Sequence, residues 1–142
     1  MDAFIFNNVA TSTATLRADI PCGITDVDGL FKVLASTMKF PEYFGYNWDA
    51  FNECICDLCW LQPGDVFLIH QDLPLIRDEK NLRIYLSCLI DAVENWRHNG
   101  SNFISQYGSD DRKRLDKLKN RNFQVVFPPS AKADIVRIIS DS

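Results

Sequence analysis

The stretch FPEYFGYNWDAFNECICDL, residues 40–58, contains the signals that decide how the middle of this chain folds. Pro41 and Gly45 interrupt regular structure, because proline lacks an amide donor and glycine tolerates turn conformations. Asn47 is a preferred helix N-cap residue, and apolar residues follow it at helical spacing. The pattern predicts a helix from Asn47 to about Cys59, with a core stripe formed by Trp48, Phe51, Ile55 and Leu58.

Three acidic residues recur at every fourth position of this predicted helix. Asp49, Glu53 and Asp57 would therefore lie along one face, where each pair of like charges costs roughly 0.2–0.5 kcal/mol. The helix dipole favours Asp49 in the first turn, but its effect has faded at the other two positions. Two interpretations stay open at this point: a solvated face and a face that binds a partner.

The charge distribution favours a basic partner. The 142-residue chain has a net charge of −4, yet residues 40–76 contain six acidic residues and no Lys or Arg. Duplex nucleic acid is not expected to bind there, because its phosphates would be repelled.

The length and the ordinary composition predict a single domain, 1–142, large enough to bury its own core.

The cysteines and the N-terminus point to the cytoplasm. Five cysteines, an odd number, follow an N-terminus with neither a basic start nor a long apolar run, so we expect reduced, mostly buried thiols and no membrane span. The C-x-C-x-x-C spacing of Cys54, Cys56 and Cys59 scatters the thiols around a helix, and no second ligand pair completes a zinc site. His70 and His98 are far apart in sequence, so no metal or cofactor is expected.

The remaining pattern predicts strands that alternate with helices. Short strands are expected at 3–6 and 14–20, which could pair as a hairpin, and a buried parallel strand at VFLIH, residues 66–70. Thr25 with Asp28 resembles a capping box for a helix over 26–38. Further helices are expected at 80–97 and 131–140, a strand at 123–127, and a short basic helix within 101–122. This order predicts an α/β fold with a small, mainly parallel sheet.

One pair of residues could still give this chain a catalytic activity. Asp49 and Glu53 are close enough on a helix to act as a carboxylate pair, as in glycosidases, with nearby aromatics to hold a sugar. No Gly-rich phosphate loop and no nucleophile elbow is present. A small carboxylate-dependent hydrolase is therefore kept as an alternative to a binding protein.

The opening stretch resembles the barstar family of intracellular ribonuclease inhibitors. The shared pattern covers Phe40, Pro41, Tyr43, Phe44, Gly45, Asn47, Trp48, Asp49 and Ala50, with Cys54 in register. The order of elements agrees over about residues 14–127. The resemblance implies a three-stranded parallel sheet with helices packed against it, here with an extra N-terminal strand and a C-terminal extension. Residues 1–13, 101–121 and 128–142 have no counterpart.

The resemblance also implies a function without catalysis. The chain would be an inhibitor or immunity protein that blocks the active site of a basic, toxin-type ribonuclease, with no cofactor. The second helix and the loop before it would enter the cleft meant for an RNA phosphate. A barstar-like module with a partner other than a nuclease is a further alternative. The implied partner-binding residues are Tyr43, Tyr46, Asp49, Asn52, Glu53, Asp57 and Asp91.

Two of these positions depart from the family pattern. Barstar has aspartate where this chain has Glu53, so the carboxylate here stands one methylene further out. A contact tryptophan is replaced by Asn52. These departures imply either that the partner's pocket differs or that the chain is a distant relative with another nuclease as its partner.

Overall fold

The computed structural model describes residues 3–7, 14–58, 60–61, 64–97 and 121–140. Within these ranges, strands and helices alternate along most of the chain, as the sequence predicts. The elements in chain order are β1 (Phe4–Ile5), β2 (Leu16–Ile20), α1 (Val27–Thr37), α2 (Trp48–Asp57), β3 (Gly64–His70), α3 (Glu79–Arg97), β4 (Arg121–Val126), the 3₁₀ turn η1 (Pro129–Ala131) and α6 (Lys132–Ser140).

The strands form one parallel sheet with the order β1-β4-β3-β2. The predicted hairpin of the first two strands is wrong, because β1 pairs with β4 and β2 pairs with β3 at the opposite edge. The two longest strands, β3 and β4, pair with each other at the centre of the sheet, which leaves the shorter β1 and β2 at its edges. The sheet therefore has three core strands and the extra N-terminal strand as a fourth.

The central strand β3 is buried on both faces. Val66, Phe67 and Leu68 are successive residues, and all three are buried, as expected for a parallel strand covered on both sides. Its register aligns Leu68 with Ala18 of β2 and with Val125 of β4. This run of apolar side chains anchors the helices above it.

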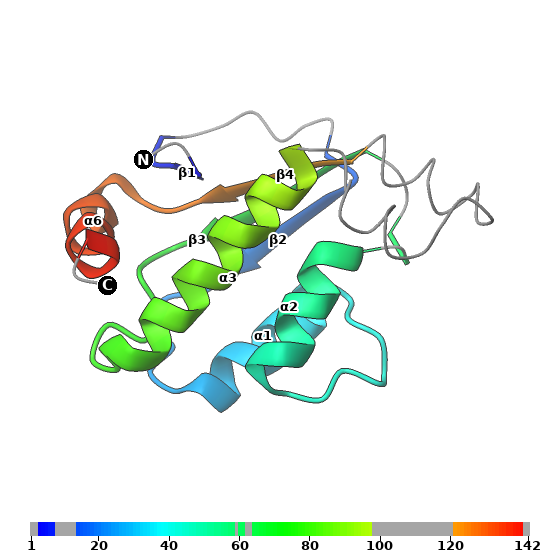
Figure 1. The fold of residues 1–142 in the computed structure, drawn as a ribbon, viewed down its shortest axis with the longest axis horizontal. Coiled ribbons are helices and arrows are strands. Elements are labelled where there is room, and N and C mark those ends of the chain that lie inside the picture. Colours follow the sequence, from blue (N-terminus) through cyan, green and yellow to red (C-terminus); the bar gives the residue numbers. More distant parts are fainter. Residues whose placement is uncertain (1–2, 8–13, 59, 62–63, 98–120, 141–142) are drawn as a thin grey trace.

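The crossover helices lie on one face of the sheet. The strands β2, β3 and β4 are neighbours in chain order, and right-handed crossovers then place their connecting helices on the same side. Figure 1 shows α3 crossing in front of the sheet, with α2 beside it. The helix α6 lies at the other end of the molecule from α2, and no described helix is long and apolar enough to cross a membrane.

The helix starts follow the sequence signals with one correction. Asn47 caps α2 as predicted, but the cap of α1 is Asp26 rather than Thr25. The Asp26 carboxylate accepts a hydrogen bond from the Gly29 amide at 2.7 Å, which places the cap one residue later in the chain. The predicted basic helix falls mostly on residues 98–120, which lie outside the described part of the chain.

A buried histidine joins three elements of the core. His70, at the end of β3, is 3% exposed, and its ring stacks on Phe127 with a centroid distance of 4.0 Å. Its Nδ1 lies 2.9 Å from the Val126 carbonyl oxygen, which can only accept, so Nδ1 carries the proton. The neutral Nε2 then accepts from the Tyr85 hydroxyl of α3 at 2.7 Å. This neutral network ties α3 to the sheet.

The stability of the fold should therefore fall in mild acid. Burial lowers the pKa of His70 from 6.5 to about 4, so below pH 6.5 the unfolded chain binds a proton that the folded chain refuses. The stabilisation is complete above about pH 6.5 and is lost as the pH falls toward 4. We expect a loss of about 2 kcal/mol between pH 7.5 and pH 5, measured by urea unfolding. A His70→Gln variant should be less stable at pH 7.5 and show a flatter dependence, and an equally steep profile would contradict this assignment.

Candidate functional site

The loop that precedes α2 is held from both ends. The Phe40 amide donates to the Ala35 carbonyl at 3.0 Å, and the Phe44 amide donates to the Pro41 carbonyl at 3.0 Å. The Phe44 side chain is buried, with its ring 4.9 Å from that of Phe40. Because Phe44 points inward, its neighbours in the loop point outward: Tyr43 is 75% exposed and Tyr46 is 49% exposed.

The helix α2 begins at a side-chain cap. The Asn47 side-chain oxygen accepts from the Ala50 amide at 2.8 Å, and the Asn47 carbonyl accepts from the Phe51 amide at 2.9 Å. Gly45 leaves room for this turn, since a Cβ there would lie 3.1 Å from the side-chain nitrogen Nδ2 of Asn47. The cap thus joins the exposed loop to the helix in a defined geometry.

Removal of this cap should destabilise the protein. We expect Asn47→Ala to lower the free energy of unfolding by about 1 kcal/mol, because the Ala50 amide loses its acceptor. Asn47→Asp should retain nearly all of the stability, since aspartate caps equally well. Urea unfolding at pH 7 measures both, and equal losses in the two variants would show that the cap does not stabilise the helix.

The far end of α2 is fastened to α3. The Trp96 indole donates to the Ile55 carbonyl at 2.9 Å, and the Asn95 amide group donates to the Cys56 carbonyl at 3.4 Å. These bonds use carbonyls of the last helical turn, which have no amide donor within the helix. At the start of α2, the half-buried Trp48 donates to Asn81 of α3 at 3.1 Å. The helix is therefore fixed to α3 at both ends.

A cluster of aromatic rings lies beneath α2. Phe51 is fully buried, and its ring centroid lies 5.7 Å from that of Tyr85 and 5.9 Å from that of Trp48. The Trp48 ring also packs edge-on against Phe31 of α1 at 4.7 Å. The predicted core stripe is confirmed for Phe51, Ile55 and Leu58, and Trp48 is half-buried beside it.

The opposite face of α2 carries the predicted acids. Asp49, Asn52 and Glu53 are exposed, whereas Asp57 is half-buried at the end of the helix. Asp57 lies in the last turn of α2, near the negative end of the helix dipole, and this turn contains no basic residue. The acidic residues of α2 thus lower its stability in the protein without a bound partner.

Asp91 of α3 extends this face. The pKa of Cys88 is raised to about 11, mainly by burial and then by the charges of Asp91 and Asp49. Burial likewise raises the pKa of Cys56 to about 12, with Asp91, Cys88 and Asp57 contributing after it. The two thiols therefore lie near carboxylates from both helices. We call the residues Asp49, Asn52, Glu53, Asp57 and Asp91 the acidic surface.

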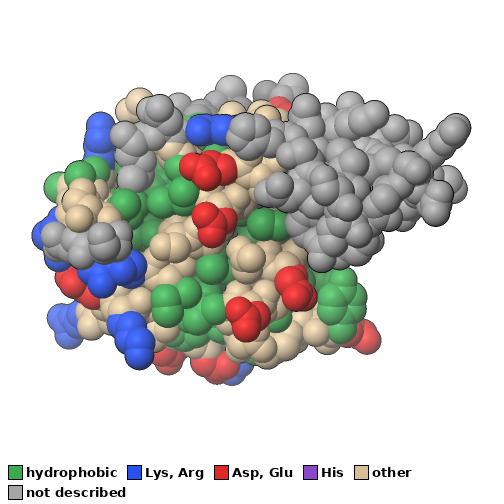
Figure 2. Space-filling model, in the orientation of Figure 1, with side chains coloured by type: hydrophobic (Ala, Val, Ile, Leu, Met, Phe, Trp, Pro, Cys, Tyr) green, Lys and Arg blue, Asp and Glu red, His purple; other side chains and the backbone are tan. Residues whose placement is uncertain are grey.

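The described cations do not neutralise three of these acids, Asp49, Glu53 and Asp91. Figure 2 shows acidic side chains over α2 and α3, with the Lys and Arg side chains nearer the edges of this face. Asp49, Glu53 and Asp91 form no ion pair with any Lys or Arg in the described ranges. The described ion pairs lie elsewhere and include Arg17 with Asp19, Lys32 with Asp28, and Arg137 with Glu79 and Asp134.

The Trp60 side chain, which follows α2, is held by packing. The Trp60 indole donates to the Met38 carbonyl at 3.1 Å and packs edge-on against Phe40, so this ring holds the end of α1.

Cys54 and Cys56 are buried and Cys22 is exposed, and these thiols form no disulfide. Within the described residues, no three His, Cys, Asp or Glu side chains gather where they could hold a metal.

The site also contains residues that the sequence did not single out. Lys32 and Ser36 of α1, together with Glu42 of the loop, line a groove next to Tyr46. Glu42 lies within the stretch quoted at the start, but neither helical spacing nor a partner residue in the sequence identifies it as a site residue. The two α1 residues are polar positions on an amphipathic helix, and only the packing of the loop against α1 brings them to the site.

The fold and the acidic surface define a small parallel α/β protein with an exposed, rigidly held acidic helix. The chain belongs to the barstar family: the family model described as "Barstar (barnase inhibitor)" matches residues 14–108, about two thirds of the chain. Searches of the curated proteins and of the solved structures gave no significant match. The family suggested by the sequence motif is thereby confirmed.

Proposed function

We propose that this protein inhibits a ribonuclease by placing its acidic surface in the enzyme's active-site cleft. The observation that carries the proposal is the exposure of Asp49, Glu53 and Asp91, none of which forms an ion pair with a Lys or Arg among the described residues. A ribonuclease concentrates cationic groups where it holds the RNA phosphate. Carboxylates on a rigid helix can occupy the same positions, with Glu53 at the phosphate pocket.

The way α2 is held supports tight binding. Its cap and its bonds to α3 fix the carboxylates before a partner arrives, so little conformational entropy is lost on association. Repulsion among the acids is relieved when a cationic cleft encloses them. Tyr43 and Tyr46 supply exposed aromatic area next to the charges, and tyrosine is enriched among hot-spot residues. Opposed electrostatic fields should also make association fast and dependent on salt.

The same geometry gives less support to a hydrolase. A carboxylate that acts as a general acid near neutral pH needs a desolvated environment to raise its pKa. Asp49 and Glu53 instead lie exposed on the outer face of a helix, and neither lines the groove beside α1 or the groove beside β1 that the described residues form. The proposal is therefore a binding protein without catalytic activity. An immunity role in the cytoplasm, against a toxin nuclease of the same cell, forms part of it.

Inhibition at fixed stoichiometry tests the proposal. The purified chain is titrated into barnase, and into the product of the adjacent gene if that product cleaves RNA, with a fluorogenic RNA substrate as readout. We expect RNA cleavage by at least one enzyme to fall to the baseline at one equivalent of the chain. The chain itself should turn over no substrate. Full cleavage by each enzyme at a tenfold excess would overturn the proposal and favour a partner that is not a nuclease.

A further inference from the structure

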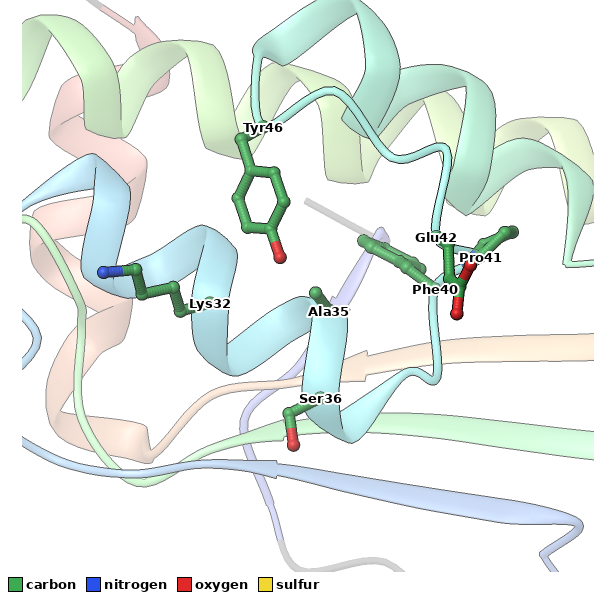
Figure 3. Close-up of a pocket in the computed structure, with 7 residues that line it drawn as sticks. All are labelled: Lys32, Ala35, Ser36, Phe40, Pro41, Glu42 and Tyr46. Carbon is green, nitrogen blue, oxygen red and sulfur yellow. The ribbon is translucent and has the colours of Figure 1, made fainter.

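A groove runs between α1 and the loop over residues 39–46. It has a volume of about 360 Å³ and is lined by Lys32, Ala35, Ser36, Phe40, Pro41, Glu42 and Tyr46. Figure 3 shows Lys32 and Glu42 toward opposite ends of this groove, with the Tyr46 ring extending from the loop toward α1 between them. The groove lies beside the acidic surface, because Tyr46 directly precedes the Asn47 cap of α2.

The lining combines apolar walls with one available carboxylate. Phe40, Pro41 and Ala35 supply apolar area, and the Tyr46 ring adds an aromatic face. The cation at one end is already engaged, since Lys32 lies 3.0 Å from the Asp28 carboxylate, whose hydrogen bond raises the pKa of Lys32. Glu42 at the other end is exposed and forms no ion pair with a described Lys or Arg.

The backbone places the Tyr46 ring at a conformational cost. Tyr46 has a φ of 53°, in the left-handed region that L-residues with a side chain rarely adopt, whereas Lys39, with a φ of 57°, follows the C-cap of α1, where this conformation commonly ends a helix. Such conformations cost about 1–3 kcal/mol each and cluster at functional sites. The Tyr46 ring contacts Phe44 at 4.9 Å but stays half-exposed, so core packing does not account for its position.

We infer that this groove receives an arginine side chain of the basic partner. The inference rests on the proposed function and extends it from α2 to the neighbouring face of α1. An arginine combines an apolar stem with a planar cation. The stem matches Phe40 and Pro41, and the guanidinium can stack on the Tyr46 ring while it donates two hydrogen bonds to the Glu42 carboxylate. A lysine would gain less, because its ammonium cannot bind in a bidentate geometry.

The complex with the inhibited ribonuclease gives the first test. We expect Glu42→Gln and Tyr46→Leu each to raise the dissociation constant about tenfold, which is the scale of a charge-assisted pair at an interface. Asp134→Asn removes one acidic charge from the distant α6 and should leave the dissociation constant unchanged. Wild-type affinity in both groove variants would overturn the inference and leave the proposed function intact.

A small probe tests the groove independently of any nuclease. N-acetyl-arginine methylamide is titrated into ¹⁵N-labelled protein, with the isosteric, uncharged citrulline derivative as the matched control. We expect saturable shifts of the Ser36, Glu42 and Tyr46 amides with the arginine probe, at least about threefold smaller shifts with citrulline, and loss of the effect in Glu42→Gln. Equal shifts from both probes, or arginine-induced shifts confined to α2, would overturn the inference.

Discussion

Replacement of Glu53 by Gln should weaken the nuclease complex by about 2–5 kcal/mol, or roughly 30-fold to 5,000-fold in the dissociation constant. The reason is that the substitution removes the central charge of the acidic surface and leaves a partner cation buried without its counter-ion. Coupling energies of about 1.5–7 kcal/mol for close charge pairs in the barnase–barstar complex, after which the family is named, bracket this range.

The same substitution should make the free protein slightly more stable. Glu53 lies four residues from both Asp49 and Asp57, so its neutralisation removes two repulsive pairs, worth roughly 0.4–1 kcal/mol together. Opposite signs for binding and stability are expected of a side chain kept for function. Isothermal titration and urea unfolding measure the two quantities, with Asp134→Asn as the control for charge alone.

The length of the side chain at position 53 can be tested separately. If the partner's pocket fits the longer carboxylate, Glu53→Asp should weaken binding by about 1–3 kcal/mol although the charge is kept, because the hydrogen-bond geometry is lost. A dissociation constant in Glu53→Gln within twofold of the wild type would remove Glu53 from the interface altogether.

Truncation of Phe51 should have the largest effect on stability. Its ring is fully buried, with centroids of four other rings within 6.3 Å: Phe31, Phe40, Trp48 and Tyr85. We expect Phe51→Ala to lower the free energy of unfolding by about 3–5 kcal/mol, through lost burial and the cavity that remains. This loss is a large part of the roughly 5–15 kcal/mol that stabilises a typical domain.

A conservative variant at position 51 shows how much of this loss of stability comes from the lost side-chain volume. Phe51→Leu keeps most of the volume and should cost about 1–2 kcal/mol, so the two variants should differ clearly in their urea midpoints. Phe51→Ala should also weaken nuclease binding although Phe51 touches no solvent, because the ring cluster seats the acidic helix. A loss below about 1 kcal/mol in Phe51→Ala would mean that this cluster does not hold α2 in place.

The local signals in the sequence were sufficient for the elements and for the face of α2. The Asn47 cap and the spacing of Phe51, Ile55 and Leu58 determined a helix whose acids point away from the core, because helical periodicity separates the two faces whatever surrounds them. The apolar run of β3 likewise determined a central strand. The motif around these residues was also sufficient to indicate the family.

Contacts between distant segments were decided only by the tertiary structure. The pairing of β1 with β4 depends on which strands compete for the centre of the sheet, so local pattern wrongly suggested a hairpin. Asp91 joins the acids of α2 only because Trp96 and Asn95 fasten α3 beside that helix. The groove at Tyr46 needs both α1 and a left-handed backbone conformation. Such features arise from packing between elements, which no periodicity within a single element encodes.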